Sequence, residues 1–209
     1  MLQIKQFSKR YQDQLVLTID ELTISPGISW LKGENGAGKT TLFKSIAGIV
    51  PFEGELSLDD VSIKKEPISF RKLVNYSEAE PYFPEFLTAK DIVRFVGKTK
   101  NTSIEEQDGY CRMLGIDQYF TKPCGTFSSG MLKKLSLTIA FFGQPKLIIL
   151  DEPLVTLDEA SRIILMNMVN EKLKDPSMIF LMSSHQSMDS AEFSVENVFR
   201  IQNKSIVRL

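Results

Sequence analysis

The residues of this chain with the clearest chemical capacity lie in one glycine-rich run, Gly33-Glu-Asn-Gly-Ala-Gly-Lys-Thr40. A glycine, four residues of any type, Gly-Lys and then Ser or Thr is the pattern of a phosphate-binding loop. The glycines let the backbone wrap closely enough for successive N–H groups to point at phosphate oxygens, and a following helix adds its positive N-terminal end. Lys39 can then place a charge on the β- and γ-phosphates of a nucleotide, and the Thr40 hydroxyl can bind Mg²⁺.

Two adjacent carboxylates occur far along the chain, at Asp151 and Glu152. They follow Leu147–Leu150, a continuous apolar run typical of a strand buried on both faces of a parallel sheet. Ligands gather at the carboxyl ends of such strands. Asp151 can therefore hold Mg²⁺, directly or through water, and Glu152 can orient and deprotonate an attacking water. Adjacent acids are also common at solvated strand ends, so the catalytic interpretation depends on their combination with the phosphate-binding loop.

His185, the single histidine, follows a second apolar run, Met178–Met182. A histidine in this place is commonly a hydrogen-bonded structural residue. The functional interpretation is that it donates a hydrogen bond to the γ-phosphate. That role requires the two apolar runs to be neighbouring strands.

The elements that must position these residues begin and end with strands. Strands are predicted at Leu2–Phe7, Leu15–Ile19, Ile28–Lys32, Glu55–Ile63, Leu147–Leu150 and Met178–Met182, and a hairpin at Val198–Ile201 and Ser205–Arg208. A helix is predicted over Gly38–Gly48, with a glycine at its end. The glycine-rich run thus lies between a strand and a helix, a context that argues against a chance match in a glycine-rich turn.

The middle of the chain is predicted to be helical. Capping-box spacings at Thr88–Asp91 and Ser103–Glu106 begin helices that continue to about Val96 and about Leu114, and further helices are expected from Ser128–Gly130 to about Phe142 and over the amphipathic Asp158–Leu173. Strand–helix alternation with two all-apolar strands predicts an α/β fold with a parallel core. We expect a single domain, in which residues 1–84 and 144–209 form the core and residues 85–143 form a helical insertion.

Composition excludes several classes of protein. The chain has 209 residues, with 25 Lys and Arg against 26 Asp and Glu, and this balance offers no support for nucleic-acid binding. Its two cysteines, Cys111 and Cys124, are too few for a disulfide framework and suit a reducing compartment. The longest stretch without charged residues, Pro176–Met188, is too short and too polar for a membrane span, and the N-terminus has no apolar signal region. These observations predict a cytosolic protein.

Taken together, the motifs resemble those of the ATP-binding subunit of ABC transporters, and the resemblance covers nearly the whole chain. Besides the phosphate-binding loop (Walker A), the two acids (Walker B) and the switch histidine, four family motifs occur in the family's order. They are an A-loop aromatic at Tyr11, a Q-loop region near Tyr76–Pro81, a signature sequence at Phe127–Met131 and a D-loop at Thr156–Asp158. This ordered set is far more specific than any single motif.

The resemblance implies a P-loop NTPase core with a parallel sheet, an N-terminal antiparallel β subdomain and an inserted helical subdomain. It also implies ATP and Mg²⁺ as ligands and head-to-tail pairing with a second such subunit, identical or related. Each ATP would lie between the phosphate-binding loop of one chain and the signature helix of the other. The implied nucleotide contacts are Tyr11, Gly33, Asn35, Gly36, Ala37, Gly38, Lys39, Thr40, Thr41, Ser128, Ser129, Gly130 and Asp158. The implied catalytic residues are Lys39, Glu152 and His185, and the implied metal ligands are Thr40 and Asp151.

Several positions depart from the family pattern or allow a second interpretation. Ala79 stands where the Q-loop usually has glutamine, and Glu78 or Glu80 could replace it if the loop shifts by a residue. The signature has Ser129 for glycine and Met131 for glutamine. ATP binding should survive these changes, whereas hydrolysis by the isolated subunit is expected to be slow. Tyr11 would stack on adenine, and the alternative is that a tyrosine near the first strands belongs to the core.

An aromatic segment near the Q-loop suggests a partner. Tyr82–Leu87 contains three aromatic side chains, which in this family would lie where a membrane permease docks. The alternative is that they pack the helices against the core. The leading functional prediction is the ATP-hydrolysing subunit of a transporter with a separate permease, an exporter by its compact length, located on the inner face of the cell membrane. The alternatives are a cassette protein acting on ribosomes or nucleic acid, and a weakly hydrolysing regulatory module.

Overall fold

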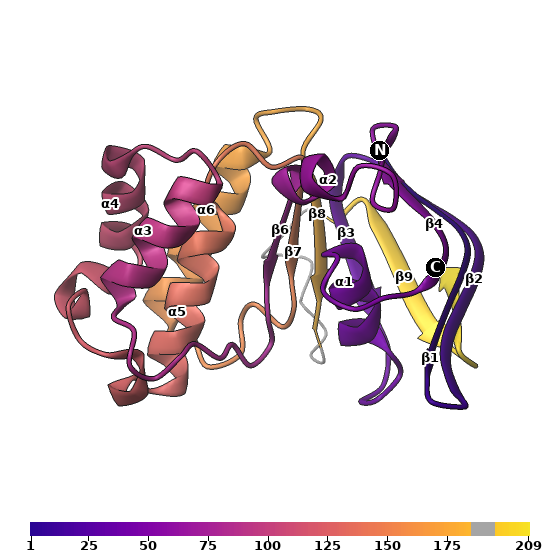
Figure 1. The fold of residues 1–209 in the computed structure, drawn as a ribbon, viewed down its shortest axis with the longest axis horizontal. Coiled ribbons are helices and arrows are strands. Elements are labelled where there is room, and N and C mark those ends of the chain that lie inside the picture. The colour runs from indigo at the N-terminus through magenta and orange to yellow at the C-terminus, as the bar shows by residue number, and fades with distance from the viewer. Residues whose placement is uncertain (185–194) are drawn as a thin grey trace.

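The computed structural model describes residues 1–184 and 195–209, which form two β-sheets with helices between and beside them (Figure 1). The larger sheet has the strand order β10-β9-β3-β8-β7-β6. Its strands are β3 (Gly27–Lys32), β6 (Val74–Ser77), β7 (Leu147–Leu150), β8 (Ile179–Ser183), β9 (Asn197–Gln202) and β10 (Ser205–Arg208). Neighbouring strands run parallel except in the β9–β10 hairpin, so the predicted α/β class with a parallel core is confirmed.

The smaller sheet is antiparallel and has the order β2-β1-β4-β5. Its strands are β1 (Leu2–Tyr11), β2 (Gln14–Ile24), β4 (Glu53–Leu58) and β5 (Val61–Ser62). The prediction of one strand over Glu55–Ile63 is wrong, because Asp59 and Asp60 adopt positive φ angles of 46° and 67° and turn the chain back on itself. Aspartate tolerates this conformation better than most residues. β1 and β2 extend beyond their predicted ends because their pairing continues to Tyr11 and Ile24.

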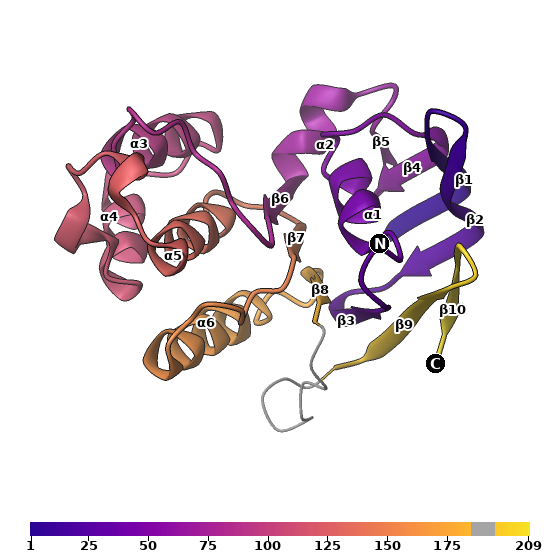
Figure 2. The ribbon, with the colours of Figure 1, turned by 90° about the horizontal axis from the view of Figure 1, so that it is seen from below.

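Helices cover both faces of the larger sheet. They are α1 (Lys39–Ile46), α2 (Pro67–Leu73), α3 (Ala89–Thr99), α4 (Ile104–Met113), α5 (Ser129–Ala140) and α6 (Glu159–Lys172), with short 3₁₀ turns at Ile116–Tyr119 and Cys124–Thr126. Figure 2 shows α1 and α6 on opposite faces of the parallel strands, with α3, α4 and α5 grouped beyond β6. Both predicted capping boxes are confirmed, since Thr88 and Ser103 each exchange hydrogen bonds with the third residue of the helix that follows.

Two hydrophobic cores meet at the parallel sheet. Alternate residues of β7 point to opposite faces, so Ile148 and Leu150 join the core with α5 and α6, while Leu147 and Ile149 join the core with α1 and the smaller sheet. All four side chains are fully buried. This explains the continuous apolar sequence that identified the strand.

β6 and α2 are elements that the sequence analysis does not predict. β6 reads Val-Asn-Tyr-Ser, and its Asn75 and Ser77 are buried polar residues that hide the apolar pattern. Asn75 Nδ2 donates to the carbonyls of Ala140 and Phe142, each at 2.8 Å. These bonds satisfy the two N–H donors of the buried Asn75 amide and attach the end of α5 to the sheet. Over the described residues, no helix has the length and apolarity needed to cross a bilayer.

Candidate functional site

The glycine-rich run leaves β3 and enters α1, as its pattern predicts. Gly36 and Gly38 adopt φ angles of 77° and 108°, which favour glycine. The loop borders a cavity of about 620 Å³, here called the phosphate cleft. The phosphate cleft is lined by Asn35, Gly36, Ala37, Gly38, Lys39, Thr40, Thr41, Lys44, Glu78, Ala79, Glu80 and Glu152. Seven of the predicted nucleotide contacts, Asn35 through Thr41, therefore lie on one cavity.

Lys39 folds back over its own loop. Its Nζ donates to the carbonyls of Gly33 and Glu34, at 2.7 and 3.0 Å, and the side chain is only 6 % exposed. Burial lowers the pKa of the Lys39 ammonium, while the carboxylates of Glu152 and Asp151 act in the opposite direction. The Lys39 ammonium thus lies near the carboxylates of Asp151 and Glu152, which follow β7 and are distant from Lys39 in the sequence.

Asp151 joins the acid motif to the phosphate-binding loop. Its side chain is fully buried, and Oδ2 accepts a hydrogen bond of 2.6 Å from the Thr40 hydroxyl. Oδ1 accepts one of 2.5 Å from the Ser183 hydroxyl, and the more distant Tyr76 hydroxyl also points at Oδ2, at 3.4 Å. Burial, followed by the charges of Asp151 and Glu78, raises the pKa of Tyr76, which therefore stays a donor. Three hydroxyls thus fix the orientation of one carboxylate.

The Thr40–Asp151 pair fits a Mg²⁺ ion that arrives with a nucleotide. Mg²⁺ takes oxygen ligands and in such sites is held by one or two protein groups together with phosphates and waters. A hydroxyl and a carboxylate that already touch supply that kind of donor set. Within residues 1–184 and 195–209, no group of three or more His, Cys, Asp or Glu side chains could hold a metal without the phosphates.

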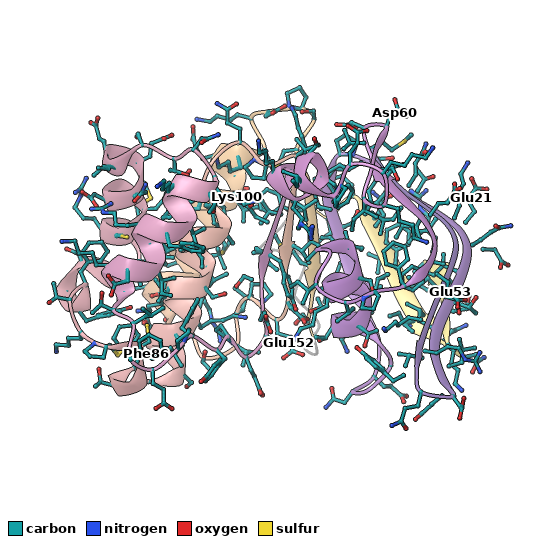
Figure 3. The ribbon with its side chains drawn as sticks, viewed as in Figure 1. Glu21, Glu53, Asp60, Phe86, Lys100 and Glu152 are labelled. Carbon is teal, nitrogen blue, oxygen red and sulfur yellow. The ribbon has the colours of Figure 1, made fainter. Side chains whose placement is uncertain are left out.

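Glu152 follows directly and lines the phosphate cleft. Figure 3 shows it at the edge of the parallel sheet where β7 ends. Its φ of 48° lies in the left-handed region, uncommon for a residue with a side chain and frequent at active sites. The Glu152 N–H donates to Ser183 Oγ at 3.0 Å. Ser183, at the end of β8, therefore holds both acids at once.

Replacing Ser183 by alanine is expected to lower both stability and turnover. The Glu152 N–H would lose its acceptor and Asp151 would lose a donor, which costs about 1–3 kcal/mol for an unsatisfied buried group. Calorimetry and steady-state kcat measure the two effects. Ser29→Ala is the matched control, because Ser29 is also fully buried, on the neighbouring strand β3, but its hydroxyl has no hydrogen-bond partner. A Ser183→Ala protein with wild-type kcat would contradict this role.

The strand that precedes His185 has the position that its predicted role requires. β8 lies between β3 and β7, so the two apolar runs are neighbouring parallel strands. His185 itself lies outside the described residues. Its contact with a γ-phosphate stays a prediction.

Tyr11 lies at the end of β1 and is 49 % exposed, so it is not a core tyrosine. The ammonium of Lys9 sits 4.5 Å from the centre of its ring. The Lys9 ammonium thus covers one face of the Tyr11 ring, and the exposed part of the ring is the part that could stack on an adenine base.

The signature and D-loop residues do not line the phosphate cleft of their own chain. Ser128 caps α5 by accepting a hydrogen bond from the Met131 N–H. A Cβ added at Gly130 would lie 3.1 Å from the Thr156 carbonyl, so α5 begins in close contact with the D-loop. Asp158 caps α6 and accepts a 2.8 Å hydrogen bond from Lys134, and this bond, with that of the Ser161 N–H, lowers its pKa well below the usual range.

The Q-loop region forms one wall of the phosphate cleft. Ala79 occupies the position expected for glutamine, and Glu78 and Glu80 also line the cleft. Glu78 is engaged in a 2.9 Å ion pair with Lys44 on α1. Glu80 is the exposed acid of the two.

The aromatic segment divides into exposed and packed side chains. Tyr82 and Phe86 are 77 % and 80 % exposed, whereas Phe83 packs against the helical core. A cavity of about 330 Å³, here called the aromatic groove, is lined by Tyr82 and Phe83 but not by Phe86. Its lining includes Ala47, Ile49, Tyr82, Phe83 and Ile139. The alternative that these aromatics pack the helices against the core therefore fits Phe83 but not Phe86.

Sequence reasoning missed three residues that shape the site, Ser183, Tyr76 and Lys133. Each contacts Asp151 or the turn that follows it, from an element distant in the chain. For Ser183, the polar end of an otherwise apolar strand was a usable signal. The other two gave none, because their role depends on which strands and helices become neighbours.

A parallel sheet with a phosphate-binding loop after one strand and paired acids after another defines a P-loop nucleoside-triphosphatase. A family model described as ABC transporter matches residues 17–155, more than half of the chain. The chain therefore belongs to the ABC transporter family, as an ATP-binding subunit with the ATPase fold of that family.

Named relatives extend the match to most of the chain. The cytochrome c biogenesis ATP-binding export protein CcmA of Legionella pneumophila is 32% identical over 195 residues, covering 90% of this chain and 94% of that protein. The spermidine/putrescine import ATP-binding protein PotA of Mycoplasma mycoides subsp. mycoides is 29% identical over 200 residues, covering 93% of this chain and 57% of that protein. One relative is named for export and the other for import, so the direction of transport is not established.

Solved structures share the fold. An ATP-binding subunit of an ABC transporter superposes with a TM-score of 0.88 and 25% identity, covering 100% of this chain and 89% of that chain. A dimeric ATP-binding cassette, solved in a post-hydrolysis state with ADP and Pi, gives a TM-score of 0.83 at 18% identity and covers 100% of this chain and 97% of its own.

Proposed function

We propose that this chain powers an ABC exporter whose permease is a separate protein. The observation that carries the proposal is the phosphate cleft, where Lys39, Thr40 and Glu152 meet although they come from distant parts of the sequence. The preference for export rests on the relative that is named as an export protein, which is 32% identical, against 29% for the relative named as an import protein.

In the proposed mechanism, loop N–H groups and Lys39 bind the β- and γ-phosphates. Thr40 and Asp151 hold Mg²⁺, which neutralises phosphate charge when bound. Glu152 accepts a proton from water as the water attacks the γ-phosphorus and the bond to the ADP oxygen breaks. His185 is proposed as a γ-phosphate donor.

A second subunit, identical or related, is proposed to complete each site. The residues Ser128, Ser129 and Gly130 begin α5 away from the phosphate cleft of their own chain. A helix N-terminus with free N–H groups is suited to binding phosphate from a partner chain. Tyr11 is proposed to contact adenine and Asp158 to lie at the dimer contact. We propose no nucleic-acid partner for this chain.

The permease is proposed to dock over the aromatic groove, which would place this subunit on the inner face of the membrane. Figure 3 shows Phe86 and Glu152 along the same edge of the molecule. Two exposed aromatic side chains in one short segment are unusual on a surface that meets only water.

Replacing Tyr82 by alanine is expected to weaken association with the permease at unchanged thermal stability, because this side chain lines the aromatic groove and is 77 % exposed. Phe83→Ala is expected to lower stability, because Phe83 packs in the helical core. Co-purification of the variants with the co-expressed permease, and stimulation of ATP hydrolysis by that permease, measure the first effect. Ile163→Ala on α6, also exposed, is the control. Full permease stimulation of the Tyr82→Ala protein would refute the docking proposal.

A weakly hydrolysing regulatory module is the second candidate. Ala79 favours it, because a methyl group can neither bind Mg²⁺ nor position water at the wall of the cleft. Glu152 favours turnover, since a nucleotide switch has no need of a water-activating carboxylate. ATP hydrolysis by the wild-type protein, with and without the permease, separates the two.

A further inference from the structure

A fully internal lysine connects the signature helix to both loops of the phosphate cleft. Lys133 lies in the second turn of α5 and is 1 % exposed. Its Nζ donates to the carbonyls of Glu78, Ala79 and Asp151, at 2.7, 3.3 and 2.7 Å. An ammonium has three donors, and all three are used.

This lysine has no carboxylate within ion-pair distance among the described residues. Burying an ammonium is costly, so an apolar side chain would pack at lower cost if packing were its only purpose. Burial accordingly lowers the pKa of Lys133 to about 8. The next residue, Lys134, shows the ordinary alternative, a partly exposed lysine paired with Asp158.

The three carbonyls belong to two segments that shape the phosphate cleft. Glu78 and Ala79 form its Q-loop wall, and the Asp151 carbonyl immediately precedes Glu152. Ala79 has no polar side chain that could hold this wall in place. Besides the ion pair of Glu78 with Lys44 on α1, the wall is tied to α5 through its backbone, by Lys133.

We propose that Lys133 is a positioning residue for ATP hydrolysis, and this proposal rests on the proposed function. It sets the distance between the Q-loop wall and Glu152, and it links both to the helix that begins at Ser128. A shift of α5, as a partner subunit or permease engages, is thereby transmitted to Glu152 through two hydrogen-bonded backbone segments.

Lys100 provides a matched control for this proposal. It is a partly buried lysine that donates to two backbone carbonyls, those of Arg71 and Val74, at 2.6 and 2.9 Å, and burial lowers its pKa to about 8. Arg71 lies in α2 and Val74 begins β6, so both carbonyls are at the opposite end of that strand from the phosphate cleft. Figure 3 shows Lys100 and Glu152 at opposite ends of the sheet.

The test compares Lys133→Met with Lys100→Met in the full-length subunit without permease, because Lys100 also lines the aromatic groove. Thermal stability, the Kd of a fluorescent ATP analogue with Mg²⁺, and kcat are measured for each. Both variants are expected to lose stability. Only Lys133→Met should lower kcat, by about 10- to 100-fold, the effect of a small misplacement of reacting groups. Its Kd should stay within about threefold of wild type, since no phosphate contact is removed.

Other outcomes overturn the proposal. A kcat for Lys133→Met equal to that of Lys100→Met, or a loss confined to Kd, would show that Lys133 only supports the fold or the binding of nucleotide. If Lys133→Met fails to fold, Lys133→Gln is measured, whose shorter amide can reach fewer carbonyls. A wild-type kcat for Lys133→Gln equally overturns the proposal.

Failure of the proposed function is a separate outcome, because it would appear as absent ATP hydrolysis in the wild-type protein. If that protein shows no turnover, hydrogen exchange of segments 78–80 and 151–153 decides. Faster exchange in the Lys133 variant than in the Lys100 variant supports the link, and equal exchange removes it.

Discussion

Replacing Glu152 by glutamine is expected to reduce kcat by about 10²- to 10⁴-fold, the usual contribution of a general base. The amide keeps the size of the side chain but cannot accept the proton of the attacking water. ATP affinity should remain near wild type, because Lys39, Thr40 and the loop N–H groups are untouched. Release of phosphate, measured at saturating ATP with and without permease-containing membranes, gives the result.

Glu80→Gln is the control for this prediction. Glu80 lines the same phosphate cleft and is exposed. If Glu80 replaces the missing Q-loop glutamine, its amide variant should keep or increase turnover, because it restores the expected side chain one residue along. Unchanged phosphate release by Glu152→Gln would remove Glu152 from the proposed role, and a large loss in Glu80→Gln would transfer that role to Glu80.

Replacing Lys39 by alanine should abolish tight ATP binding. The lysine already lies within the loop, with its ammonium held at 2.7 Å from the Gly33 carbonyl. A hydrogen bond from a charged donor contributes about 1.5–3 kcal/mol, so the loss of contacts to two phosphates predicts a Kd at least about 100-fold higher. Titration with a fluorescent ATP analogue measures the change.

Lys44→Ala is the matched control for Lys39, since Lys44 lines the same cleft but is neutralised by Glu78 at 2.9 Å. Its loss should change Kd only by a small factor. Tight binding retained by the Lys39→Ala protein would refute the assignment of the phosphate-binding loop.

Much of the site could be predicted from the sequence because its main parts are local. The loop around Lys39 and the acids after Leu150 are each encoded within a few residues, and strand burial of Leu147–Leu150 is visible as an apolar run. A sheet with parallel neighbours then brings them to the same edge. No long-range information was needed beyond the rule that ligands gather at the carboxyl ends of parallel strands.

The parts that sequence reasoning missed depend on which elements become neighbours. β6 carries Asn75 and Ser77, whose side-chain hydrogen bonds are made with carbonyl and hydroxyl groups from α5 and the residues just after it. Lys133 likewise looks like an ordinary surface lysine of a helix until the Q-loop wall packs over it. The Asp59–Asp60 turn was missed for a different reason: apolar residues continue on both sides of it and imitate a single strand.

β7 belongs to both hydrophobic cores, because its alternate side chains face in opposite directions. Displacing this strand would disturb packing on two sides at once, so it serves as the fixed reference point of the molecule. We therefore expect conformational change during turnover to occur in the helices around β7 and in the loop at its end, and not in the strand itself.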